Sequence, residues 1–328
     1  MPVSDWEGVR LHVVTGKGGT GKTTVAAALA LALASGGHKV LLVEVEERQG
    51  LAQLFDVAPL PYEERRLAVA RDGGDLFGLA VDAQQAMYEY LDLYYRLGRA
   101  GRALDRMGII EFATTVAPGM RDVLLTGKTY EATRRRRTDG GFVYDAVVLD
   151  APPTGRITRF LSVNAAVTSL ARVGPVSRHA AAITELISSP RTAVHVVTVL
   201  EEMPVQETAD TVGDLDDAGI PVGAVVVNQV RRPLLTVRDL AAARQGRLDR
   251  LMIEAGLRVA GLTQGESLVD RLAAEAAAHA ERVALEKRER TAVAALDRPT
   301  YELPWLPDGI DLAGLYELGA ALSDQGAA

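Results

Sequence analysis

Short apolar runs alternate with longer helical stretches along most of the chain. Several runs are apolar at every position, as in Ala146–Leu149, which is typical of strands buried on both faces. Seven strands are predicted, at Leu11–Thr15, Lys39–Glu44, Leu76–Val81, Tyr144–Asp150, Ala193–Leu200, Val222–Asn228 and Thr300–Leu303. Helices are predicted at Lys22–Ala34, within 84–136, and at 157–187, 205–218, 266–296 and 311–323. The alternation predicts an α/β fold, with a mostly parallel sheet of about seven or eight strands and helices on both faces.

The same pattern predicts one domain covering residues 1–328, because no Pro/Ser-rich linker or fixed-period repeat interrupts it. Residues 84–137 are expected to be a helical insert between the third and fourth strands, whereas 233–262 has no clear period and receives no assignment. The N-terminus lacks the features of a signal peptide, and the most apolar stretch, Val25–Ala34, is only about half the length of a membrane span. We therefore expect a cytoplasmic protein that meets membranes only indirectly.

Composition excludes several kinds of chemistry. The 328 residues include no cysteine, so disulfides, thiolate metal sites and iron–sulfur clusters are ruled out. The net charge of −7 argues against nucleic-acid binding, which needs a basic face. Only five of the 36 basic residues are lysines, yet Lys17 and Lys22 lie in one glycine-rich segment.

That segment is a phosphate-binding motif in its required context. It reads Gly16-Lys17-Gly18-Gly19-Thr20-Gly21-Lys22-Thr23-Thr24, which matches G-x-x-x-x-G-K-[ST] between a predicted strand and an Ala/Leu-rich helix. The glycines let backbone N–H groups turn toward phosphate oxygens at a helix N-terminus. We therefore expect a P-loop NTPase in which Lys22 binds the β- and γ-phosphates and the Thr23 hydroxyl holds Mg²⁺. The residues expected to bind ATP or ADP here are Gly16, Gly18, Gly19, Thr20, Gly21, Lys22, Thr23 and Thr24.

A second candidate for the metal is Asp150, which ends the apolar strand Tyr144–Asp150 and precedes Ala151-Pro-Pro-Thr-Gly155. An aspartate at the carboxyl end of a parallel strand is where a water-mediated Mg²⁺ ligand belongs. An apolar run that ends in Asp is also common as a helix N-cap, and that alternative stays open. The upstream phosphate motif favours the metal role.

Together these motifs resemble the ArsA family, the arsenical pump-driving ATPases and the ATPases that target tail-anchored membrane proteins. The lysine at the second motif position marks the deviant P-loop branch, and the segment from Asp150 to Leu161 resembles the family's second switch. The resemblance extends over nearly the whole chain, from residue 10 to 324, and is greatest to bacterial single-domain members. It implies a dimeric ATPase, a homodimer or a heterodimer with a related subunit, in which Lys17 crosses to the partner's nucleotide. It also implies an adenine contact from Asn228 and a base-covering loop after Pro304.

Two departures from the family pattern concern hydrolysis. Where the family's first switch has an Asp that orients the attacking water, this chain has Glu46, which is one methylene longer. Arg156 replaces the second-switch histidine. Because positioning dominates phosphoryl transfer, we expect slow, partner-dependent hydrolysis with Lys17, Lys22 and Glu46 as the catalytic residues. The alternative is that Glu44 and Glu46 merely end an amphipathic strand.

The absence of cysteine also limits the partners that the resemblance implies. Arsenite binding through thiolates and a zinc clasp between subunits are both excluded by composition. A hydrophobic client segment remains possible, on an apolar groove built by the helical insert. The candidates for that groove are Met87, Tyr90, Leu91, Tyr94, Met107, Ile109, Ile110, Phe112, Met120 and Leu124. Ordinary core packing explains the same spacing, and both interpretations stay open.

The sequence therefore predicts a Mg²⁺-dependent ATPase switch that couples its nucleotide state to a client or partner protein. One alternative is a nucleotide-binding regulatory subunit with little hydrolysis of its own. Another is a positioning ATPase of the ParA/MinD kind, although the C-terminal residues lack a basic amphipathic anchor and the chain lacks a basic face.

Overall fold

The computed structural model describes residues 6–46, 49–95, 118–170, 175–262 and 266–328. Its centre is an eight-stranded sheet in the order β3-β4-β2-β5-β1-β6-β7-β8. Every neighbouring pair is parallel except β3–β4, which is antiparallel at the edge. The predicted α/β fold with a mostly parallel sheet is thus confirmed. The strands are β1 (Leu11–Gly16), β2 (Lys39–Glu44), β3 (Arg65–Val69), β4 (Asp75–Ala80), β5 (Ala146–Asp150), β6 (Thr192–Thr198), β7 (Val222–Val230) and β8 (Thr300–Pro304).

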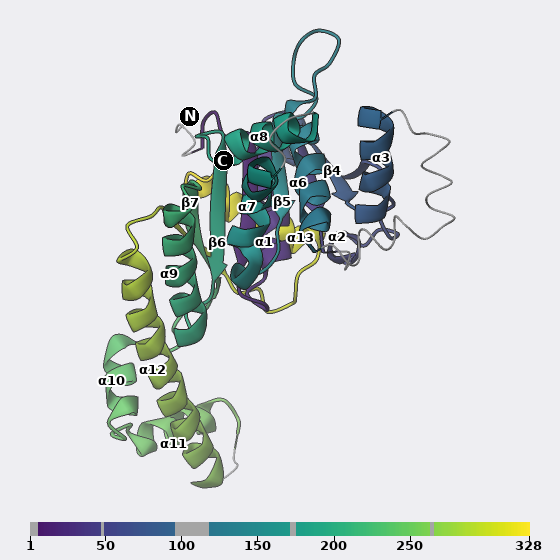
Figure 1. The fold of residues 1–328 in the computed structure, drawn as a ribbon. Helices are drawn as coiled ribbons and strands as arrows, with labels where there is room; N and C mark the ends of the chain where they lie inside the picture. Colours follow the sequence, from purple (N-terminus) through teal and green to yellow (C-terminus); the bar gives the residue numbers. More distant parts are fainter. Residues whose placement is uncertain (1–5, 47–48, 96–117, 171–174, 263–265) are drawn as a thin grey trace.

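Helices cover both faces of the sheet, and alternate strand residues point into two separate cores (Figure 1). On β2, Val40 and Leu42 belong to the core beneath α1 (Lys22–Ala34) and α13 (Leu312–Asp324), whereas Leu41 and Val43 belong to the core on the other face. That second core includes residues of α3 (Ala83–Tyr95), α6 (Pro118–Arg134), α7 (Thr154–Leu170), α8 (Pro175–Ile187) and α9 (Glu202–Asp217). Two-sided burial explains why the central strands are mostly apolar.

The structure corrects several predicted boundaries. The strand β3 was missed because it begins with two exposed arginines and lies at the sheet edge, where one face need not be apolar. The predicted helix 157–187 is two helices, α7 and α8, and α7 begins three residues earlier. A short helix, α2 (Gly50–Leu54), and a 3₁₀ turn, Arg71–Gly73, complete this part of the chain.

The helical insert contributes α3 and α6, which contact each other, and α6 also packs on α7 and α8. Of the residues considered for a client groove, Met107, Ile109, Ile110 and Phe112 lie outside the described residues. Met87 and Leu124 are buried at 7% and 4% exposure and belong to the core. Core packing is therefore the correct interpretation for these two, while Met120, 42% exposed, fits the alternative.

An arm of three helices projects from the body of the protein (Figure 1). It begins after β7 and consists of α10 (Val237–Arg244), α11 (Arg250–Val259) and α12 (Glu266–Ala294). The segment 233–262, which the sequence left unassigned, is thus mostly helical. Its side chains are largely exposed, so no single buried stripe produced a clear helical period.

Candidate functional site

The phosphate motif forms a loop between β1 and α1, at the carboxyl edge of the sheet. At two of its glycines, neighbouring atoms lie so close to the backbone that no side chain would fit. A Cβ at Gly16 would lie 2.2 Å from the carbonyl oxygen of Val197, and one at Gly21 would lie 2.4 Å from Nδ2 of Asn228. Inside the loop, the Thr20 hydroxyl donates a hydrogen bond to the Lys17 carbonyl at 2.8 Å. This hydrogen bond fixes the turn of the loop, whose backbone N–H groups precede the N-terminus of α1.

Asp150 and Thr23 meet as the sequence predicts. The Thr23 hydroxyl donates to Oδ2 of Asp150 at 2.7 Å. Glu44 joins them, because the register of β2 and β5 places Glu44 beside Asp150. One Glu44 oxygen accepts from the backbone N–H of Gly50 at 2.7 Å. Sequence reasoning treated Glu44 as the end of a strand, and only its position at the carboxyl edge of the sheet could have indicated this site.

The charges in this cluster are poorly solvated. Burial raises the pKa of Asp150 to about 6, opposed by the Thr23 hydroxyl and the Lys22 ammonium. The carboxylates of Glu44 and Glu46 raise the pKa of Asp150 further, which places both within electrostatic reach of it. Burial also raises the pKa of Glu44. The cluster thus concentrates negative charge that a cation would relieve.

The residues present fit a bound Mg²⁺. Oδ1 of Asp150 and Oε2 of Glu44 are buried and have no hydrogen-bond partner among the described residues. Mg²⁺ is typically held by one or two carboxylates together with phosphates and water. Within the described part of the chain, no group of three or more His, Asp or Glu residues could hold a metal ion alone. The set Thr23, Asp150 and Glu44 therefore suits a cation that a nucleotide's phosphates help to hold.

Lys17 makes a contact that the sequence does not indicate. Its ammonium lies 2.6 Å from Oε1 of Glu207 on α9, and the two side chains are 31% and 36% exposed. The other oxygen of Glu207 accepts from the Thr154 hydroxyl at 3.2 Å. Glu207 therefore connects the phosphate loop to the first turn of α7. Lys17 and Glu207 are 190 positions apart, so no local spacing could reveal the pair.

Asn228, at the carboxyl end of β7, is buried and donates from Nδ2 to the carbonyl oxygen of Thr20 at 2.9 Å. A cavity of about 550 Å³ adjoins it, lined by residues 199–204 and 228–231 and by three side chains of α12. Pro304 ends β8 next to Val230 and does not line this cavity. The structure thus brings Asn228, but not Pro304, to a space of the size that a nucleotide base needs. The adenine contact and the loop after Pro304 stay predictions.

The second-switch segment is attached to the helical insert. Arg156, which stands where the family has histidine, lies 3.6 Å from Oδ1 of Asp122 on α6. Burial raises the pKa of Asp122, and the positive charge of Arg156 opposes that rise. Further along α7, the Asn164 amide donates to the Thr126 hydroxyl of α6 at 2.8 Å.

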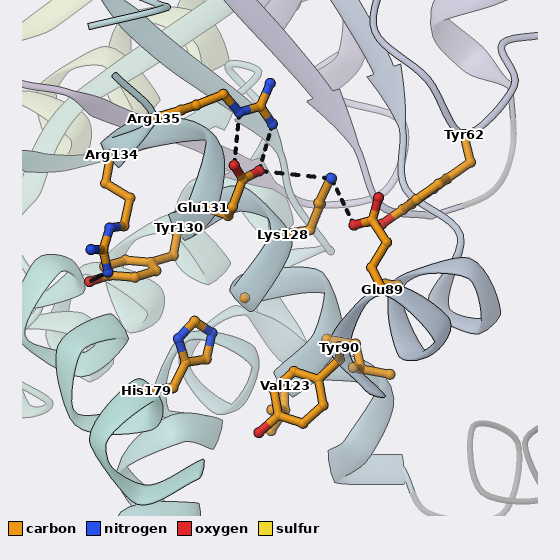
Figure 2. Close-up of a pocket in the computed structure, with 13 residues that line it drawn as sticks. Tyr62, Glu89, Tyr90, Val123, Lys128, Tyr130, Glu131, Arg134, Arg135 and His179 are labelled. Carbon is orange, nitrogen blue, oxygen red and sulfur yellow. Dashed lines mark hydrogen bonds and ion pairs between the residues drawn. The ribbon is translucent and has the colours of Figure 1, made fainter. Parts of the chain in front are cut away.

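A second cavity, of about 450 Å³, lies between the insert helices α3 and α6 and the side chain of His179 on α8 (Figure 2). Its polar side chains are mostly paired with one another. Lys128 contacts Glu89 at 2.8 Å, and Arg135 binds Glu131 through two hydrogen bonds. The cavity wall is formed by tyrosines and ion pairs, not by the Met- and Leu-rich surface that a client groove implies. The client groove stays a prediction that these side chains do not support.

The fold and the phosphate loop, with Lys17 at the second position of its motif, define a P-loop ATPase of the deviant branch. A family model described as anion-transporting ATPase matches residues 9–174. The ATPase BagA of Mycobacterium tuberculosis is 51% identical over 319 residues, which cover 97% of this chain and 94% of that protein. The arsenical pump-driving ATPase of Acidiphilium multivorum is 26% identical over 327 residues, 92% of this chain and 53% of that protein. The chain belongs to the ArsA family of ATPases, as its motifs indicate.

No helix among the residues that the structure describes is both long enough and apolar enough to cross a membrane.

Proposed function

We propose that this protein is a Mg²⁺-dependent, ATP-hydrolysing switch that works as a dimer. Lys22 binds the phosphates, and Thr23 and Asp150 hold Mg²⁺, which neutralises developing charge on the phosphates when it is bound. Glu46 orients the attacking water, and Lys17 reaches the nucleotide of the partner subunit. Asn228 and the cavity beside it receive the adenine.

The observation that carries this proposal is the convergence of Thr23, Asp150 and Glu44 beside the start of α1. A buried helix N-cap would use its carboxylate on backbone N–H groups. Asp150 instead accepts from the Thr23 hydroxyl and keeps its other oxygen unpartnered. That arrangement has a physical reason in a cation site and none in a cap.

The test is ATP turnover by the purified full chain, with Mg²⁺ and with excess chelator. Lys22→Ala should abolish Mg²⁺-dependent turnover, because the phosphate then loses its point-charge partner. Lys287→Ala removes an exposed lysine on α12 that does not line the cavity beside Asn228, and should match the parent. Turnover that survives Lys22→Ala, or that does not need Mg²⁺, refutes the proposal.

A second candidate function is a nucleotide-binding regulator with little hydrolysis, and Glu46 is the observation that favours it. Its longer side chain alters the distance from the backbone to the water that must be oriented. Glu46→Asp should raise turnover if slow hydrolysis reflects misplacement, and Glu46→Ala should reduce it. Normal ATP affinity with negligible turnover in all three proteins would establish the regulator instead.

The dimer and its coupling to another protein form the last part of the proposal. Lys17 lies at the carboxyl edge of the sheet with about one-third of its side chain exposed, so an incoming subunit could reach it. Light scattering with and without Mg²⁺-ATP should show a mass increase in the parent and none in Lys17→Ala. A protein that stays monomeric in ATP, alone and with co-purified proteins, would contradict the dimeric switch.

A further inference from the structure

The cavity of about 550 Å³ at the end of β7 has one wall that comes from the arm. Its other walls are formed by residues 199–204, which lead from β6 into α9, and by residues 228–231. The remaining wall consists of Arg282, Leu285 and Glu286 on α12. A molecule that fills this cavity therefore contacts the edge of the sheet and the arm helix together.

A β-bulge forms the sheet side of the cavity. Two residues of β7, Asn228 and Gln229, lie opposite a single residue of β8, Leu303. Gln229 has a φ of 59°, in the left-handed region that residues other than glycine rarely adopt. Bulges redirect side chains and are common next to functional sites, and backbone strain of this kind is typical of binding sites. The local geometry thus favours a ligand at this wall.

On the arm side, most hydrogen-bond donors of the Arg282 guanidinium are unused. Nη2 donates to Nδ1 of His279 at 2.8 Å, and the guanidinium makes no other hydrogen bond within the part of the chain that the structure describes. Nε is buried 3.5 Å from Oε1 of Glu286, an ion pair without a hydrogen bond. The Arg282 side chain as a whole is 39% exposed, so the outer end of its guanidinium can meet a ligand.

The other arginine of the cavity is engaged by the protein. The guanidinium carbon of Arg231 lies 4.3 Å from the ring centre of Trp305. Trp305 directly follows β8, and its backbone N–H donates to the carbonyl oxygen of Val230 at 2.9 Å. Arg231 therefore stacks on an aromatic ring of the chain, whereas Arg282 keeps its donors for a molecule inside the cavity.

We propose that Arg282 binds the adenine base of the nucleotide, so that the arm helix α12 is part of the nucleotide site. This inference rests on the proposed function, because it takes the cavity beside Asn228 as the adenine site. A guanidinium N–H donates to a ring nitrogen of the base, such as N7, which is a hydrogen-bond acceptor. Glu286, whose side chain is 15% exposed, orients the guanidinium through its ion pair.

This contact connects the nucleotide to the whole arm. Helices α10 and α11 pack on α12, which runs from the body of the protein into the arm (Figure 1). Near its C-terminal end α12 is fixed to the sheet, where Val293 shares a core with Val227 of β7 and Arg290 pairs with Glu302 of β8. Arg282 precedes this anchor by about two helical turns. A base held by Arg282 therefore restrains α12 between its anchor and the outer part of the arm.

The test is calorimetric binding of two ligands to the full-length protein in Mg²⁺: a slowly hydrolysed ATP analogue, and inorganic tripolyphosphate, which has no nucleoside. Arg282→Leu should weaken binding of the analogue roughly tenfold and leave tripolyphosphate binding unchanged, because only the analogue loses a hydrogen bond from a charged donor. Arg282→Lys keeps the charge but not the planar fork, and should lose most of the same affinity. The matched control, Arg288→Leu, removes an exposed arginine of α12 outside the cavity and should bind both ligands like the parent.

Hydrogen exchange gives a second readout that does not depend on affinity. With saturating analogue, the backbone amides of residues 279–289 should exchange more slowly in the parent and in Arg288→Leu, but not in Arg282→Leu. Tripolyphosphate should slow none of them. All variants should unfold at the parent's temperature without ligand, because Arg282 contacts only neighbours on its own helix.

Two results would overturn this inference alone. Unchanged binding of the analogue by Arg282→Leu removes the contact with the base, and equal losses for both ligands assign Arg282 to the phosphates instead. In both cases the parent still binds the analogue, and the proposed function stands. A parent that does not bind the analogue at all refutes the proposed function, and this inference with it.

Discussion

The ion pair between Lys17 and Glu207 predicts that Glu207 restrains the switch. Glu207→Gln removes the negative charge but keeps an oxygen that can accept from Thr154. Because both side chains are about one-third exposed, the pair is worth at most about 1 kcal/mol. If Lys17 must leave Glu207 to reach a partner's nucleotide, the substitution should tighten the ATP-bound dimer by up to about fivefold for each subunit, or about thirtyfold when both subunits carry it.

The assay is the dissociation constant of the dimer, measured by analytical ultracentrifugation with Mg²⁺ and a slowly hydrolysed ATP analogue. Asp210→Asn is the matched control, because Asp210 is exposed on the same helix and, among the described residues, accepts a hydrogen bond only from Gln206. In a Lys17→Ala background, Glu207→Gln should not restore the dimer, because the contact that it frees is already gone. An unchanged constant in the single variant, or a weakening that parallels Lys17→Ala, would refute the restraint.

Two other substitutions test the loop and the core. Gly19 and Gly21 have similar φ values of 91° and 87°, so alanine strains the backbone about equally at both positions. Of these two, only Gly21 would bring its new Cβ against the side chain of Asn228. Gly21→Ala should therefore weaken ATP binding, measured by calorimetry, roughly tenfold more than Gly19→Ala. Equal losses would show that the contact with Asn228 is unimportant. Burial lowers the pKa of His195 to about 4, below its ordinary 6.5, so the neutral ring stabilises the fold above pH 6.5 and this stability is lost as the pH falls toward 4. The parent should lose unfolding free energy, measured in urea, between pH 7 and pH 5, and His195→Gln should make that loss smaller by about 2 kcal/mol. An unchanged loss would assign the pH dependence of stability to other groups such as His12.

Sequence reasoning found the parts of the site that local pattern determines. The phosphate motif and Asp150 each lie at the carboxyl end of a buried strand, and parallel strands bring these ends to one edge. Glu207 could not be found in this way, because its contact with Lys17 depends on where α9 crosses the sheet. The same holds for His12 and His195, which looked scattered but lie on the neighbouring strands β1 and β6, with ring nitrogens 3.0 Å apart.

The helices α10 and α11 of the arm were not predicted from the sequence, for a different reason. A helix with one buried apolar face has a clear period, but the apolar side chains of α11 spread both toward the arm and toward solvent, and only Arg250, Glu254 and Arg258 mark its polar side. The edge strand β3 was missed because its exposed arginines break the apolar run that marks the central strands. In both cases, side chains that face solvent removed the signal on which the prediction depends.

The helix α7 connects the nucleotide loop with the helical insert through one turn. Thr154 touches Glu207, and Arg156, two residues later, is the cation nearest to the buried Asp122 of α6. Arg121 and Arg159 also oppose the rise in the pKa of Asp122, so loss of Arg156 would weaken the compensation of this buried carboxylate without removing it. The Lys17–Glu207 pair and the cavity that α6 lines are thus joined by one short run of contacts, Glu207–Thr154 and Arg156–Asp122.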